Sequence, residues 1–274
     1  MKVMARQALT SRFPILAPLV VESRIALKSL QTRRPEYQLY RAPAALFPFR
    51  IHKHHSVMRR RLGDADPRLQ ELKVQNLRRA AVELDGLSLA PGQILSYWGQ
   101  IGRPSPQRGF TTGMLISNGK PIEGQGGGLC QMANLLYWLA LHSPLTVTEH
   151  HHHSLDLFPD SGRVLPFGSG ASVFFNYVDL QLRNDTLDTF RLSVWLDDVA
   201  LYGELRANRE PQHTYKITEE DHRFYRRGGE VYRTNRLYQS KIDRRTGNVV
   251  SKRLMTFNDS RVLYPVDDAL LSDG

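Results

Sequence analysis

The sequence predicts an α+β protein in which a central helix, preceded by a glycine-rich loop, packs on a mostly antiparallel sheet. Two stretches, 66–84 and 129–141, place apolar residues at helical spacing. Most segments after residue 145 instead alternate or run apolar over strand lengths. A chain of 274 residues can bury a core of its own, because about three quarters of the unfolded surface is hidden at that size.

The expected elements follow one another in a simple order. Residues 66–67, Asp-Pro, start the first helix, and Gly86 ends it. A turn with a short strand and then a hairpin-like turn at 118–119 lead to the glycine-rich loop. The second helix runs over about 129–141, before a proline. Strands follow, including "LTVTEHHHHS" and "GSGASVFFNYVDLQLRN", with a hairpin tip at 245–248.

Composition divides the chain into a basic, partly irregular segment 1–50, an α+β domain 51–265 and a tail 266–274. Residues 1–62 carry thirteen Lys and Arg against two Glu, a net charge of +11, so the rest of the chain sums to −1. This asymmetry predicts an anionic polymer or an anionic membrane face as a partner, with a solvated basic arm as the alternative. No nucleic-acid-binding motif accompanies the charge, so no specific nucleic acid is predicted.

The single cysteine predicts a fold without an intramolecular disulfide, which favours a cytoplasmic location. The apolar patch 13–21 is interrupted by Pro14 and Pro18, and no small-residue cleavage pattern follows it. We therefore interpret residue 1 as a mature N-terminus. No apolar run approaches the roughly 20 residues that a transmembrane segment needs.

The only cysteine lies in the stretch "GQGGGLCQ", at the start of the second helix. Glycines permit close backbone approach, and a helix start stabilises anions. The thiolate of Cys130 would gain from that field, so Cys130 is a candidate nucleophile. Gln131 could donate its amide to an oxyanion, and the loop Gly126, Gly127 and Gly128 would shape that region.

Four consecutive histidines, 150–153, supply a candidate base. If the segment is a strand, His151 and His153 share one face and either could lie opposite Cys130. Asp179 is the leading candidate for the carboxylate that orients the histidine, with Asp156 and Asp160 as lesser candidates. The order of cysteine on a helix, then histidine, then acid is that of papain-like and transglutaminase-like folds.

Two alternatives to catalysis remain open. The cysteine can be a small buried apolar residue with no chemistry, and the glycines can serve close packing alone. Cys130, His151 and His153 can also supply three ligands for zinc. Apart from zinc no cofactor is predicted, because "GQGGG" lacks the Lys-Ser/Thr of a phosphate-binding loop.

Residues 76–184 contain a series of closely spaced motifs: "PGQ..S.W", "GGGLCQ", "LHSPL", "HxHS", "DLFPDS", "PFGSGA" and "DLQLRN". With these motifs the stretch resembles the vancomycin-resistance W-like (VanW) family, of the short stand-alone type, and the resemblance extends over most of 50–265. Trp98 and Ser154 belong to these motifs and are candidates, with the glycine loop, for substrate binding. The chain departs from longer relatives by lacking an export signal and by its full histidine run.

The resemblance implies an accessory protein of cell-envelope or peptidoglycan metabolism, or of glycopeptide resistance, with peptidoglycan or its precursors as the substrate class. Joined to the lone cysteine, it predicts a cysteine-dependent hydrolase or acyltransferase-like site. The alternatives are a non-catalytic module that binds a peptide or glycan, and a zinc site.

Overall fold

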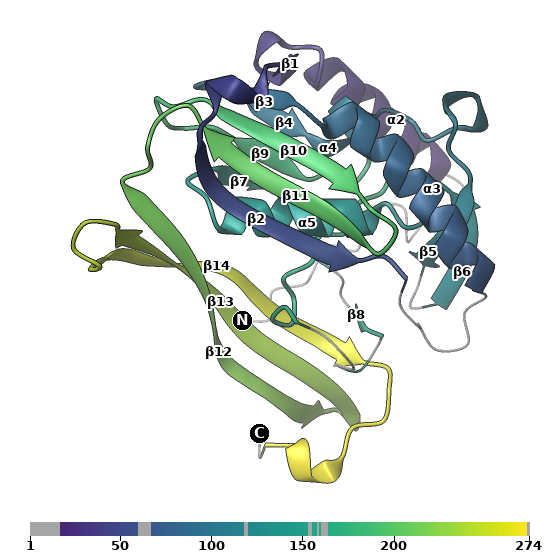
Figure 1. Cartoon of the computed structure of the whole chain (residues 1–274). Coiled ribbons are helices and arrows are strands. Elements are labelled where there is room, and N and C mark those ends of the chain that lie inside the picture. The colour runs from purple at the N-terminus through teal and green to yellow at the C-terminus, as the bar shows by residue number, and fades with distance from the viewer. Residues whose placement is uncertain are drawn as a thin grey trace.

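The computed structural model describes residues 17–59, 67–117, 120–152, 155–157, 159 and 164–272. It confirms an α+β fold, with mostly antiparallel strand pairing (Figure 1). The α-helices of this described part are α2 (Ala17–Gln31), α3 (Pro67–Leu84), α4 (Tyr97–Ile101) and α5 (Cys130–Leu141).

The described strands form a main sheet of five strands and three further sheets of four, three and two strands. The main sheet has the order β1-β3-β10-β11-β2, formed by Tyr40–Arg41, Leu87–Leu89, Phe190–Leu196, Ala200–Ala207 and Phe49–Val57. A second sheet, β12-β13-β14-β8, comprises His213–Arg227, Glu230–Asp243, Val249–Val262 and Leu155–Asp156. The order β4-β9-β7 joins Ile94–Ser96, Gln181–Arg183 and Thr146–Glu149, and β5 (Thr112–Ser117) pairs with β6 (Lys120–Gln125).

The helix α5 is the centre of the core. It packs against the main sheet (Figure 1), and a Cβ on Gly203 of β11 would lie 2.9 Å from side-chain atoms of Leu135 and Leu139. At its far end, Gln239 of β13 donates to the carbonyl of Leu141 at 2.7 Å. One buried helix thus holds the main sheet and the long strands together.

Several sequence predictions are confirmed. The helices α3 and α5 lie where apolar periodicity places them, because each has a continuous buried stripe. The hairpin of β5 and β6 spans the predicted turn at 118–119, which itself lies outside the described residues. The tip between β13 and β14 contains Gly247, at φ 72°.

The N-terminal segment is more regular than predicted. Residues 17–31 form the helix α2, because Pro18 lies in the first turn, where a helix needs no backbone N–H donor. The predicted domain boundary at residue 50 falls within β2, which pairs along its length with β11. The segment therefore contributes directly to the main sheet.

The prediction that the histidine run lies in a strand is wrong for the described part of the run. The strand β7 ends at Glu149, so His151 does not alternate in a strand as expected. The reason is its partner: β9 comprises only 181–183, and Glu149 pairs with its first residue after a register shift. Most of the predicted strand in "GSGASVFFNYVDLQLRN" is likewise irregular or turn.

Candidate functional site

The cysteine lies at the first position of α5, as predicted, but its surroundings favour the neutral thiol. The Sγ of the half-buried Cys130 lies 3.7 Å from the carbonyl oxygen of Val173, to which it donates. Burial raises the pKa of the Cys130 thiol, although hydrogen bonds with backbone groups act in the opposite direction. Burial thus opposes the lowered pKa that a nucleophilic thiolate requires.

The middle glycine of the loop packs on the backbone of the protein itself. A Cβ on Gly127 would lie 2.0 Å from the carbonyl carbon of Gly113 in β5. The side chain of Asn76, from α3, donates to the carbonyl oxygen of Gly127 at 2.9 Å. The close approach that glycine permits is thus used to join the loop to β5 and α3.

The two flanking glycines have backbone conformations that other residues rarely adopt. Gly126 has φ 73° and Gly128 has φ 89°. A Cβ at Gly128 would lie 2.0 Å from the Cγ of Lys73, and one at Gly126 would lie 2.7 Å from Pro104. The buried ammonium of Lys73 donates to the Met58 carbonyl and, at 2.7 Å, to the Gln70 side chain.

The amide of Gln131 is bonded to strand β2. Its Nε2 donates to Ser56 Oγ at 2.8 Å and to the carbonyl oxygen of Val57 at 2.9 Å. These bonds attach the first turn of α5 to the end of β2. An oxyanion would have to compete with both of them for the donor that the sequence analysis assigned to Gln131.

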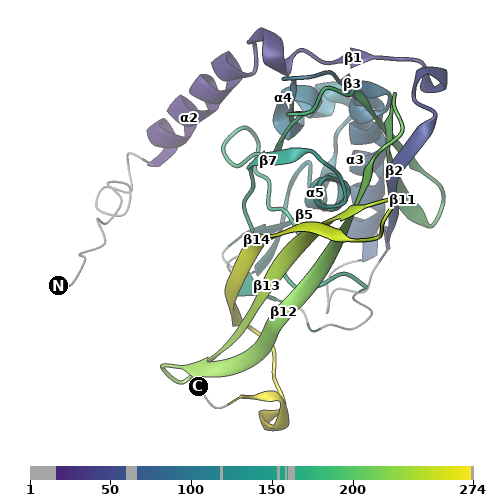
Figure 2. The same ribbon diagram turned by 90° about the vertical axis from the view of Figure 1, so that its left-hand side faces the viewer.

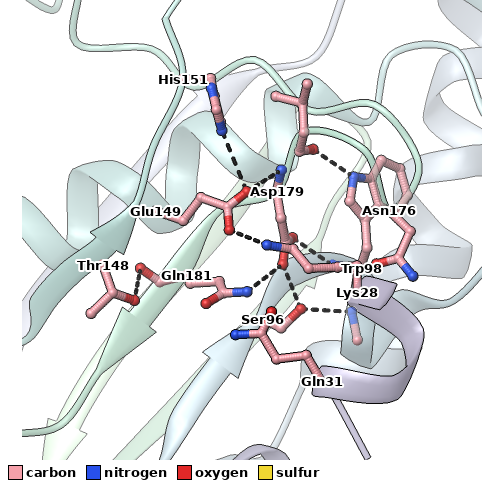
Figure 3. A network of polar contacts seen from close by, with 12 residues as sticks. Lys28, Gln31, Ser96, Trp98, Thr148, Glu149, His151, Asn176, Asp179 and Gln181 are labelled. Carbon is pink, nitrogen blue, oxygen red and sulfur yellow. Dashed lines mark hydrogen bonds and ion pairs between the residues drawn. The ribbon is translucent and has the colours of Figure 1, made fainter. Parts of the chain in front are cut away.

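The carboxylate of Asp179 is fully buried and holds the short helix α4 (Figure 3). It accepts from Ser96 Oγ at 2.6 Å, from the backbone N–H of Trp98 at 3.0 Å and from Gln181 Nε2 at 3.2 Å. Burial raises the pKa of Asp179, and these donors, led by Ser96, oppose the rise. Within the described residues the side chain of Asp179 is hydrogen-bonded to Ser96, Trp98 and Gln181, and not to a histidine.

The ring of Trp98 belongs to the interior. It is buried, and its indole N–H donates to the carbonyl oxygen of Val178 at 3.1 Å. Its ring lies edge-on to Tyr97 and to Phe175, with centroid distances of 5.0 and 5.6 Å. In this conformation Trp98 offers no open ring face for stacking on a sugar.

The imidazole of His151 interacts with a carboxylate at the surface (Figure 3). Its Nε2 lies 3.3 Å from Glu149 Oε1, and Glu149 also forms an ion pair with Lys28 of α2. The other predicted base, His153, and the predicted binding residue Ser154 lie outside the described residues. The predicted pairing of Cys130 with His153 therefore stays a prediction.

A second group of histidines was not anticipated from the sequence. His52 of β2 stacks on His142, the residue that follows α5, with centroids 4.1 Å apart. His54 lies 5.9 Å from the ring of Trp138, which also contacts His142. Burial lowers the pKa of both His52 and His54 to about 4. The period of two in "HKH" was a usable signal, since it places both rings on one strand face.

Metal binding gains no support from the described residues. Among 17–59, 67–117, 120–152, 155–157, 159 and 164–272, no group of three His, Cys, Asp or Glu side chains is arranged to hold an ion. The alternative zinc set of Cys130, His151 and His153 includes a residue outside these ranges. It stays a prediction.

The fold and the site define an α+β protein whose single cysteine is the first residue of a buried helix. The neighbouring Gln131 and the predicted partner Asp179 are hydrogen-bonded to other elements of the fold. The profile of the family "VanW like protein" matches residues 72–206. The chain belongs to this family. In addition, "Vancomycin B-type resistance protein VanW" from Enterococcus faecalis (strain ATCC 700802 / V583) is 29% identical over 280 residues, covering 97% of this chain and 98% of the relative. No solved structure matches the chain significantly.

No helix in the described part of the chain is long and apolar enough to cross a membrane.

Proposed function

We propose that this protein is an accessory factor of glycopeptide resistance that acts in cell-envelope metabolism. The observation that carries the proposal is the similarity to a vancomycin-resistance protein along nearly the whole of both chains, 97% and 98%. A match of that extent includes the N-terminal segment and the long C-terminal strands as well as the family block at 72–206. The cytoplasmic location remains part of this proposal.

The mode of action we favour is binding of peptidoglycan or its precursors without a covalent step. Three features disfavour a covalent step. Burial raises the pKa of the Cys130 thiol, the Gln131 amide is bonded to β2, and the Asp179 carboxylate is bonded to α4 and β9. A cysteine hydrolase needs a thiolate, an oriented base and a free oxyanion donor at the same place.

A cysteine-dependent hydrolase or acyltransferase is the second candidate. The position of Cys130 at the first residue of α5 favours it, because an N-terminal helix position stabilises a thiolate. The residue as a whole is also only half-buried. In this candidate His153 or His151 is the base, and Asp179 would act only if its present hydrogen bonds rearranged.

The two modes are separated by incubating the full chain with a mixture of muropeptides and nucleotide-linked muramyl peptide precursors. Retention of ligands is measured by equilibrium dialysis, and their masses are measured before and after. We compare the natural protein with Cys130→Ser and with Ser193→Ala as a control remote in sequence from the site. We expect retention by all three proteins and unchanged masses.

A mass change produced by the natural protein and lost in Cys130→Ser would establish the catalytic candidate instead. If no component of the mixture is retained or altered by correctly folded protein, the peptidoglycan assignment is wrong. Circular dichroism and thermal unfolding of each variant provide the check on folding.

A further inference from the structure

Several of the contacts between the helix α2 and the rest of the protein are polar. Lys28 pairs with Glu149, and the Arg24 guanidinium lies 5.4 Å from the ring centroid of Tyr177. The side chain of Asn176 donates to the carbonyl oxygen of Ile25 at 3.2 Å. Figure 2 shows α2 extending to one side of the body.

The opposite side of α2 is apolar and exposed. Leu19, Leu27 and Leu30 are 68%, 67% and 60% exposed. Together with the exposed residues Ser23 and Ala26 they recur at helical spacing and lie along one side of the helix. None of these five side chains is charged. We call them the leucine face.

An apolar stripe on a helix normally faces the core, because burial of apolar surface is the main source of helix stability in proteins. Here the stripe faces away from the body. Three large leucine side chains on one side of a 15-residue helix form the kind of contiguous apolar surface that marks an interaction site.

The charge around the leucine face identifies what covers it. Residues 1–37, which contain α2 and the residues next to it in sequence, carry seven Lys and Arg against two Glu, a net charge of +5. Arg33 and Arg34, which directly follow the helix, are both exposed. An apolar helix face next to exposed basic residues matches the acyl chains and negative headgroups of an anionic lipid surface.

We propose that α2 is an interfacial helix that places its leucine face into the headgroup region of an anionic membrane, with the helix axis parallel to the surface. A second copy of the chain is a poorer partner, since it would bring a second segment of charge +5 against the first. The leucine face is on α2 and Cys130 is on α5. Membrane binding by α2 therefore does not depend on peptidoglycan binding.

The first experiment is co-sedimentation of the full chain with vesicles of phosphatidylcholine alone or mixed with phosphatidylglycerol. We expect binding to the mixed vesicles, and weak binding to phosphatidylcholine. Leu27→Ser with Leu30→Ser should lower the partition coefficient by at least about tenfold, because each change removes a leucine side chain from lipid. Leu187→Ser, at a leucine that is 85% exposed outside α2, is the matched control and should bind as the natural protein does.

The second experiment places an environment-sensitive fluorophore on the leucine face. In a Cys130→Ser background, Ser23→Cys or Thr246→Cys provides one labelling site, and Thr246 lies at the exposed tip between β13 and β14. We expect the emission of the label at Ser23 to shift to shorter wavelength when mixed vesicles are added. The label at Thr246 should keep its emission in water.

The outcomes are distinct. If the natural protein does not bind mixed vesicles, or if the double leucine variant binds equally well, the assignment of the leucine face is wrong. If the natural protein forms a dimer in light scattering that the double leucine variant abolishes, while vesicles bind neither protein, the face is a contact between copies. Unchanged thermal unfolding of the variants shows that the fold is retained.

Discussion

At the scale of single residues, Cys130 shows two local effects in competition. Its position at a helix start stabilises a thiolate, while burial destabilises it, and burial is the larger effect because the pKa of the thiol is raised. Sequence analysis could identify the first effect from the glycine run and the helix start. It could not estimate the second, because burial depends on Val173 and other residues distant in the chain.

The raised pKa of Cys130 predicts a specific reactivity profile. The alkylation rate with iodoacetamide should rise by about tenfold per pH unit from pH 6 to 9, since the thiolate fraction grows in that proportion below the pKa. At pH 7.5 it should be slower than the rate for glutathione. Mass spectrometry of timed samples measures it, with Cys130→Ser as the unlabelled control. A rate that is constant over this range would indicate an activated thiolate.

At the scale of elements, helices with a buried stripe were predictable and the short connecting elements were not. Apolar periodicity predicted α3 and α5, because each buries one side or nearly all of its surface. It missed α2, whose leucines face outward and whose segment contains prolines. It also extended β7 into the histidines, because the length of a strand depends on its partner, and β9 comprises only 181–183.

The position of Cys130 after a glycine loop and at a helix start was predictable, and the hydrogen-bond partners of the candidate residues were not. The glycine loop and the helix start lie as expected around Cys130. The hydrogen-bond partners of Asp179 and Gln131 come from α4, β9 and β2. Such partners depend on how elements pack in three dimensions, and no local pattern near either residue encodes them.

The packing of the glycine loop on β5 gives a prediction at the same scale. In Gly127→Ala the new Cβ would meet the Gly113 backbone, which has no side chain that can move away. We expect the free energy of unfolding to fall by about 3 kcal/mol, in the upper range for overpacking. Urea denaturation followed by circular dichroism measures this change.

The control for that variant is Gly92→Ala. Gly92 has φ 78°, and a Cβ there would have no atom within 4 Å. Its cost is therefore the backbone strain alone, about 1 kcal/mol. Equal losses in the two variants would contradict the assignment of Gly127 to close packing.

At the scale of the whole molecule, α5 joins the main sheet to the long strands. His52 and His54 of β2 lie close to His142, which directly follows α5. We call this group of three residues the histidine junction. His52 Nε2 is buried with no hydrogen-bond partner within the described part of the chain. Protonation of these rings would place positive charges beside one another in a partly buried contact. The junction is therefore built for neutral imidazoles.

This junction predicts how stability depends on pH. The pKa values of His52 and His54 are about 4 in the folded protein, lowered mainly by burial, against about 6.5 in an unfolded chain. Between these values the unfolded state binds more protons than the folded state. The contribution of these two histidines to stability is therefore fully present well above pH 6.5 and is lost as the pH falls toward 4. The pKa of His142 is lowered by burial and adds to the same trend. Urea midpoints at pH 4.5, 5.5, 6.5 and 7.5 measure the dependence.

The double variant His52→Gln with His54→Gln isolates this effect from the other titrating groups of the molecule. Its midpoint should be lower at neutral pH, because the stacking of His52 on His142 is lost. Its decline between pH 6.5 and 4.5 should nevertheless be clearly smaller than that of the natural protein, since two groups with lowered pKa values are gone. His213→Gln, in β12, should retain the natural decline. If the double variant declines as steeply as the natural protein, the pH dependence originates outside the histidine junction.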